Sequence, residues 1–82
     1  MKYVLYILHS DKGDKYYIGH TNNIERRLCE HNDPKQKGWT KSYHPWRLIY
    51  TEDALDRSDA VNKERYLKSL KSKVKIKKYI AG

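Results

Sequence analysis

Cysteine, glycine, proline and phenylalanine are scarce in this sequence: its 82 residues include one cysteine, four glycines, two prolines and no phenylalanine. Cys29, being alone, can form neither a disulfide within the chain nor a cysteine-rich zinc site. This usage indicates a reducing compartment, so we expect a cytoplasmic protein. The N-terminal apolar run, residues 3–8, is too short to cross a bilayer and lacks the organisation of a signal peptide, so no membrane partner is expected.

Acidic residues are also fewer than basic ones. The chain carries 18 Lys and Arg against 10 Asp and Glu, which gives a formal net charge of +8. Such an excess in a small chain favours a polyanionic partner such as nucleic acid, although a basic surface can also serve solubility alone. The length predicts one domain, residues 1–82, with one modest core and a site on an open face.

The first third of the chain predicts a hairpin. Residues 3–9 are rich in β-branched and aromatic types and apolar on both faces, which is typical of a central strand. A polar turn separates them from a second strand at residues 15–19. A turn centred near residues 11–12 would place Tyr6 opposite Tyr17, with both side chains on one face of the sheet.

A helix should follow the hairpin. Asn22 or Asn23 can cap it, and with Asn22 as the cap Glu25 takes the third helical position of a capping-box variant. The helix runs to about Asn32. Ile24 and Leu28, four residues apart, form its apolar stripe. Arg27 and His31, also four residues apart, flank that stripe on one side.

The second half predicts a loop at residues 32–45, a strand at 46–51 and a helix at about 56–70. Four residues of this helix face inward by their spacing: Ala60, Val61, Leu67 and Leu70. The tail, residues 72–80, alternates lysine with apolar residues, which would also suit a strand. We prefer a short helix with three residues packed inward: Val74, Tyr79 and Ile80.

Bases and aromatic residues interleave in and after the loop. The set comprises Lys37, Trp39, Lys41, Tyr43, His44 and Trp46. Such a mixture can hold phosphates and stack on unpaired bases, or the lysines can be merely solvated. We assign Lys37, Trp39 and Lys41 to nucleic-acid binding, with both readings open for Trp39, and place Trp46 in the core.

Three short segments occur in a characteristic order: Val4-Leu5-Tyr6, Tyr17-Ile18-Gly19, and then Arg27 with His31. This order resembles the GIY-YIG nuclease superfamily, and the likeness continues through the later residues Tyr43, Pro45, Leu48, Tyr50, Ala60, Glu64 and Leu67-Lys68. It is similar to the small stand-alone bacterial branch, and also to the nuclease domain of the excinuclease C subunit. One departure is that Val4 stands where the first motif has its glycine.

The resemblance implies an α+β fold, a three-stranded antiparallel sheet with flanking helices in the order β-β-α-β-α-α. It implies a metal-dependent endonuclease that uses Mg²⁺ or Mn²⁺ to hydrolyse phosphodiester bonds. The expected substrate is structured or damaged DNA, as in DNA repair, more than RNA, and a protein partner or a homodimer could assist. The alternative is a non-catalytic DNA- or RNA-binding module on the same fold.

Chemistry supports the roles that the resemblance implies for three residues. Arg27 offers a planar fork suited to phosphate oxygens. Tyr6 and Tyr17 would orient or deprotonate the attacking water. Because a free phenol has a pKa of about 10, deprotonation would need a nearby positive charge or metal. The other reading is that both tyrosines are core aromatics.

Glu64 falls on the inward face of its helix, where a carboxylate is costly unless it is paired or bound to metal. A salt bridge, for instance to a base of the first helix, would satisfy it, but the resemblance favours a metal ligand. His31 would assist as acid or base, or be a partly exposed helix histidine. Gly19 would permit a close approach to the backbone or a bend at the end of the strand. We assign Gly19 and the next residue, His20, to nucleic-acid binding.

Overall fold

The computed structural model describes residues 2–33 and 42–82. These residues form three strands and three helices, in the order β1 (Tyr3–Ser10), β2 (Lys15–Thr21), α1 (Ile24–Asn32), β3 (Arg47–Ala54), α2 (Arg57–Leu70) and α3 (Lys73–Ala81). The order β-β-α-β-α-α and the α+β class are those expected from the sequence. No helix in the described part of the chain is both long and apolar enough to span a membrane.

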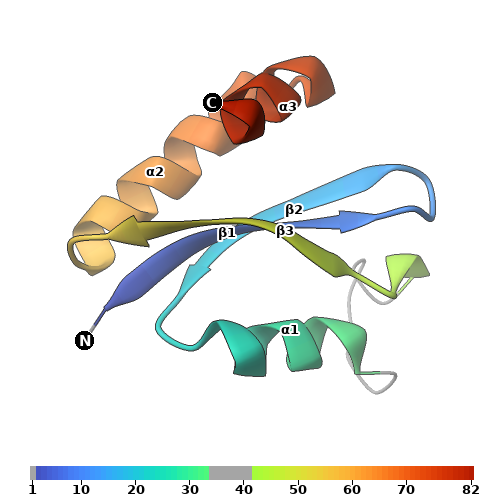
Figure 1. Ribbon diagram of the computed structural model, residues 1–82, viewed down its shortest axis with the longest axis horizontal. Helices are drawn as coiled ribbons and strands as arrows, with labels where there is room; N and C mark the ends of the chain where they lie inside the picture. The colour runs from blue at the N-terminus through green and yellow to red at the C-terminus, as the bar shows by residue number, and fades with distance from the viewer. Residues whose placement is uncertain (1, 34–41) are drawn as a thin grey trace.

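The sheet is antiparallel, with strand order β2-β1-β3, so β1 is central. One face of the sheet is covered by α1 and the other by α2 and α3 (Figure 1). Four consecutive residues at the middle of β1 have no exposed surface: Leu5, Tyr6, Ile7 and Leu8. A strand that is apolar on both faces needs cover on both, which this three-layer arrangement provides.

The register of the hairpin differs from the prediction. Tyr6 pairs with Gly19, and Tyr17 pairs with Leu8, two residues away from the expected partner. The turn is centred about one residue later than expected, and within it Gly13 and Asp14 adopt positive φ angles of 81° and 49°. A shift of two residues keeps side chains on the same face. The Tyr6 and Tyr17 rings therefore still stack, with centroids 6.2 Å apart.

Caps define where the helices begin. The Asn23 side chain accepts a hydrogen bond from the Arg26 backbone N–H at 3.1 Å, so Asn23, and not Asn22, caps α1. Asp56 caps α2 in the same way, through the Asp59 N–H at 2.8 Å. Lys71, with a φ of 50°, ends α2 in the left-handed conformation.

Each face of the sheet carries its own core. Between the sheet and α2/α3 lie Leu5, Ile7, Ile18, Leu67 and Ile76. Between the sheet and α1 lie Tyr6, Leu8 and Trp46, with Ile24 and Leu28 packed against them. Trp46 is 2% exposed, which confirms its predicted place in the core. Of the residues predicted to face inward in α2, Ala60 and Leu67 are fully buried, while Val61 and Leu70 are partly buried.

The tail is a helix, as preferred, and Tyr79 and Ile80 pack inward as predicted, but the inward placement of Val74 was wrong. Val74 is 63% exposed, and Ile76 is buried in its place, at 8%. Ser72 caps α3 and fixes its start, and this start turns Ile76 toward the sheet together with Tyr79 and Ile80. The third strand also runs further than expected, to Ala54, because Ala54 pairs with Tyr3.

Candidate active site

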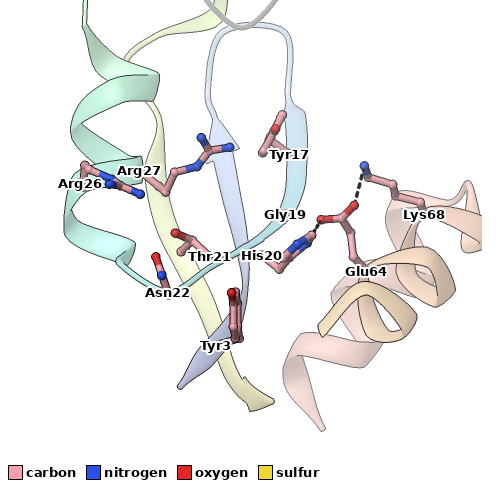
Figure 2. Close-up of a pocket in the computed structure, with 10 residues that line it drawn as sticks. All are labelled: Tyr3, Tyr17, Gly19, His20, Thr21, Asn22, Arg26, Arg27, Glu64 and Lys68. Carbon is pink, nitrogen blue, oxygen red and sulfur yellow. Dashed lines mark hydrogen bonds and ion pairs between the residues drawn. The ribbon is translucent and has the colours of Figure 1, made fainter. Parts of the chain in front are cut away.

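A groove of about 360 Å³ crosses the edge strand β2 between α1 and α2 (Figure 2). Its lining residues are Tyr3, Tyr17, Gly19, His20, Thr21, Asn22, Arg26, Arg27, Glu64 and Lys68. Side chains alternate along a strand, so Tyr17 belongs to the α1 side of β2 and His20 to the α2 side. Since no strand among the described residues pairs with the outer edge of β2, groups from both faces of the sheet meet in this groove.

Arg27 reaches the groove from α1 and is 37% exposed. The pKa of its guanidinium is raised, chiefly by the hydroxyl of Tyr6, against a smaller opposing effect of burial. Its Nε atom is buried without a hydrogen-bond partner among the described residues. Since the side chain as a whole is partly exposed in the groove, its accessible N–H groups are suited to an incoming phosphate oxygen.

Tyr6 and His31 lie behind the groove rather than in its lining. The Tyr6 hydroxyl is 3.2 Å from Nε2 of His31, and both residues are buried. Burial raises the pKa of Tyr6, outweighing the effect of Arg27, and burial together with Arg27 lowers the pKa of His31. At neutral pH the pair is therefore a phenol and a neutral imidazole. At 6% exposure His31 is not the partly exposed histidine of the alternative interpretation.

Gly19 forms the wall between this buried pair and the groove. A Cβ atom at Gly19 would lie 2.7 Å from the Tyr6 hydroxyl oxygen and 3.1 Å from Cε1 of Tyr17. Both distances are too short for ordinary packing. The prediction of a close approach at Gly19 is confirmed, and what approaches the glycine is the pair of tyrosine rings.

Glu64 lies on α2 and lines the same groove as Arg27, with 20% of its side chain exposed. Its Oε1 accepts a hydrogen bond from Nδ1 of His20 at 2.9 Å, and its Oε2 accepts one from Nζ of Lys68 at 3.0 Å (Figure 2). Burial alone would raise the pKa of Glu64, but these two hydrogen bonds outweigh it and lower the pKa. The group is thus a carboxylate at neutral pH, and its partners come from β2 and α2 rather than from the first helix.

The GIY-YIG catalytic domain family matches residues 2–79 of this chain. The chain belongs to the GIY-YIG family. It is 40% identical over 70 residues to a UPF0213 protein of Bacillus licheniformis, covering 85% of this chain and 71% of that protein. It is 33% identical over 76 residues to a UPF0213 protein of Staphylococcus haemolyticus, covering 93% and 92%.

The solution structure of a UPF0213 protein from Bacillus halodurans has the same fold. It superposes with a TM-score of 0.62 at 27% identity, covering 99% of this chain and 84% of that one. GIY-YIG domains form a nuclease superfamily, and this membership gives the chain a nuclease-type domain with nucleic acid as the class of substrate.

GIY-YIG nucleases generally use divalent metals, and the groove contains one group that suits such an ion. No cluster of three or more His, Cys, Asp or Glu that could hold a metal occurs in residues 2–33 and 42–82. A hard cation such as Mg²⁺ often takes only one or two protein carboxylates, with water and phosphate oxygens as its other ligands. The lone, ionised carboxylate of Glu64 fits this minimal role.

Five of the residues that sequence reasoning assigned to the site line this groove: Tyr17, Gly19, His20, Arg27 and Glu64. Sequence reasoning missed the other lining residues: Tyr3, Thr21, Asn22, Arg26 and Lys68. Helical spacing could have found Lys68, which is four residues after Glu64, whereas Tyr3 meets His20 only through the pairing of β1 with β2. The loop residues Lys37, Trp39 and Lys41 lie outside the described part of the chain.

Proposed function

We propose that residues 1–82 act as one GIY-YIG endonuclease domain that hydrolyses phosphodiester bonds in structured or damaged DNA with the aid of Mg²⁺ or Mn²⁺. The observation that carries this proposal is the meeting of Arg27 and Glu64 in one groove, from opposite sides of β2. A cation and an ionised carboxylate facing a common open space are the two charges that such a hydrolysis needs.

Arg27 binds the phosphate. A phosphoryl group gathers negative charge as it is transferred, so a positioned guanidinium stabilises the transition state more than the substrate. The hydroxyl of Tyr6 contacts the guanidinium, and Oε1 of Glu30 lies 3.8 Å from its Nη1 atom, so both help to hold it in place. Arg26 lines the same groove and adds attraction for neighbouring phosphates.

Tyr17 orients the attacking water, because it lines the groove beside Gly19. Tyr6 lies behind Gly19 without exposed surface, so it acts on this water indirectly, by holding the guanidinium of Arg27. His31 assists by fixing the Tyr6 hydroxyl, which lies 3.2 Å from its Nε2 atom.

Glu64 would hold the divalent cation, and a bound ion would supply Lewis-acid activation of the phosphate. His20 keeps the Glu64 carboxylate in place through its Nδ1–H. Lys68 balances the charge of Glu64 while no cation competes for it. These three side chains make up the α2 side of the site.

The charged and phenolic groups of the groove support selection by structure rather than by sequence. Arg26, Arg27 and Lys68 are suited to phosphate oxygens, which carry no sequence information. Because the groove is shallow and lies at a sheet edge, it fits a phosphate made accessible by a flap, nick, branch or lesion. This is why we propose structured DNA as the substrate.

One observation favours a second function, a DNA- or RNA-binding module without catalysis. Both carboxylate oxygens of Glu64 are already engaged, by His20 and by Lys68. If this ion pair is permanent, the groove holds phosphates and cuts nothing. Binding would then weaken with salt and would not respond to Mg²⁺.

A panel of end-labelled substrates separates the two functions: single-stranded DNA, duplex, nicked, flap and branched DNA, and RNA. Each is incubated with Mg²⁺, with Mn²⁺ or with chelator, and binding is measured in parallel at several salt concentrations. An Arg27→Ala variant, purified in the same way, controls for contaminating nuclease. Metal-dependent products that this variant does not form support the endonuclease. Salt-sensitive binding without products under any condition would contradict it and support the binding module.

A further inference from the structure

A second groove, of about 440 Å³, adjoins the first on the α2/α3 side of β2. Its lining combines apolar and basic residues: Tyr16, Ile18, Leu67, Ile76, Lys68 and Lys71. The first groove, by contrast, is lined mainly by polar and charged side chains. The proposed cleavage chemistry makes no use of this second groove.

The floor of the second groove is apolar and its rim is basic. Ile18, Leu67 and Ile76 are at most 8% exposed and belong to the core between the sheet and α2/α3. Lys68 and Lys71 are exposed at its edge. A phosphate contact alone needs no apolar floor, and a purely apolar ligand needs no pair of lysines. A nucleotide, with a flat apolar base and a charged backbone, matches both.

Tyr16 supplies an aromatic wall that is held in place. Its ring meets the ring of His9 with centroids 4.9 Å apart. His9 is in turn fixed by Asp14, whose Oδ1 lies 2.7 Å from Nε2 of His9 and whose Oδ2 accepts from Lys73 at 3.3 Å. A ring that is already positioned loses little conformational freedom when a base stacks on it.

Lys71 stands at the rim in a conformation that disfavours lysine. It ends α2 with a φ of 50°, a backbone state in which glycine or asparagine is the usual residue. The turn between α2 and α3 therefore places a lysine beside the groove at a position whose backbone conformation glycine would adopt with less strain. This arrangement suits a contact with the backbone phosphate of a bound nucleotide.

The two grooves are continuous, because Tyr17 and Lys68 line both. A base in the second groove would thus belong to a nucleotide next to the phosphate in the first. A base that remains paired and stacked in a duplex cannot enter such a groove. Resting on the endonuclease proposed above, we infer that the second groove is a subsite for one unpaired nucleobase flanking the phosphate that is cut.

The test measures binding in chelator, so that it does not depend on cleavage. One probe is a nicked DNA duplex with a single unpaired 2-aminopurine nucleotide at the nick, and the other carries an abasic residue there. Stacking on an aromatic side chain predicts that wild type prefers the base by about 5- to 150-fold. The preference should vanish in Tyr16→Leu and persist in Tyr16→Phe.

Two lysine variants provide a matched comparison of charge. Lys71→Asn removes one charge and suits the left-handed backbone, whereas Lys78→Asn removes one charge from α3 at a residue that lines neither groove. Lys71→Asn should weaken binding of the base-containing probe several-fold more than Lys78→Asn does. Equal losses would show that Lys71 contributes only general attraction, and would overturn its place in the subsite.

The fluorescence of the probe gives a reading that needs no variant. Emission of 2-aminopurine should fall on binding to wild type when the base is unpaired at the nick, and not when it is paired several nucleotides away.

Equal affinity for base and abasic probes, or a preference that survives Tyr16→Leu, would overturn the subsite and leave the proposed endonuclease activity unaffected. A base preference, together with no cleavage of any substrate in the panel described above, would overturn the endonuclease activity and leave the base-binding subsite. Absence of all binding would overturn both.

Discussion

The hydroxyl oxygen of Tyr6 lies 2.7 Å from the point that a Cβ atom on Gly19 would occupy. Tyr6 has no exposed surface, whereas Gly19 lines the groove across β2. The missing side chain of Gly19 is therefore what brings the buried Tyr6–His31 pair next to the site. Pairing of Tyr6 with Gly19 across the hairpin fixes this arrangement.

Replacing Gly19 by alanine should make the new Cβ atom clash with the Tyr6 hydroxyl, and because Tyr6 is fully buried its ring cannot swing into solvent to relieve the clash. Overpacking of this kind costs roughly 1–3 kcal/mol, and we expect Gly19→Ala to lower the free energy of unfolding by that amount. Cleavage should fall as well, because Tyr6 supports Arg27. Urea denaturation and single-turnover cleavage measure the two effects. Unchanged stability and rate would show that Tyr6 moves aside without consequence.

His20 should act on the proposed metal site through Glu64. Its Nδ1–H donates to Oε1 of Glu64 at 2.9 Å, so His20→Ala leaves that oxygen unsupported. Loss of such a supporting contact typically weakens metal affinity or activity by about 10- to 100-fold. Cleavage rates at increasing Mg²⁺ concentrations should show this shift, with partial recovery in His20→Asn. Faster cleavage by His20→Ala would mean instead that His20 competes with the ion.

Stability should depend on pH through His31. Burial, together with Arg27, lowers its pKa in the folded protein, while the unfolded chain titrates near 6.5. Between these two values the unfolded state binds more protons, so the free energy of unfolding falls as pH drops through about 6.5. His31→Gln lacks this proton linkage. Its stability should change less than that of wild type between about pH 7.5 and about pH 5.5, and an equal change would contradict the buried neutral imidazole.

A second cluster of ionisable groups should stabilise the fold without serving the site. Glu52 on β3 accepts hydrogen bonds from Lys63 at 2.6 Å, from Tyr79 at 2.6 Å and from Tyr50 at 2.7 Å. These contacts, led by those of Lys63 and Tyr79, hold the pKa of Glu52 at about 2. They fasten α2 and α3 to the sheet.

We expect Glu52→Gln to lose about 1–3 kcal/mol of stability at neutral pH, because a charge-assisted cluster loses its charge. The contribution of Glu52 is fully present above its ordinary pKa of 4.5 and is lost as pH falls toward 2. Wild type should therefore lose stability more steeply than the variant in this acid range. Urea denaturation at several pH values, with the exposed Glu25→Gln as control, checks the difference, and parallel curves would refute it.

Much of the fold follows from local periodicity. The two-sided apolar character of residues 3–9 identified the central strand, and the spacing of Ala60 and Leu67 identified the buried face of α2. The four-residue spacing of Arg27 and His31 put both on one side of α1. Such patterns determine which face a side chain takes, and these predictions depended on nothing else.

Contacts between distant segments could not be predicted in this way. The register of the hairpin depends on positive φ angles at Gly13 and Asp14, which composition alone does not reveal. The hydrogen bond between His20 and Glu64 joins residues 44 positions apart. It requires α2 to pack on the sheet with Glu64 level with His20 of β2. Val74 was placed in the core in place of Ile76 because the start of α3 is fixed by a cap that follows a left-handed residue.

The central claim is that phosphodiester hydrolysis occurs in the groove across β2 and needs the carboxylate of Glu64. Single-turnover cleavage of flap or nicked DNA by wild type, Glu64→Gln and Glu25→Gln tests it most directly, because both variants remove one carboxylate and keep the size of the side chain. We predict that Glu64→Gln binds DNA within a few-fold of wild type and cuts at least about 100-fold more slowly, while Glu25→Gln behaves as wild type. Cleavage by Glu64→Gln at the wild-type rate would contradict the assignment of the site.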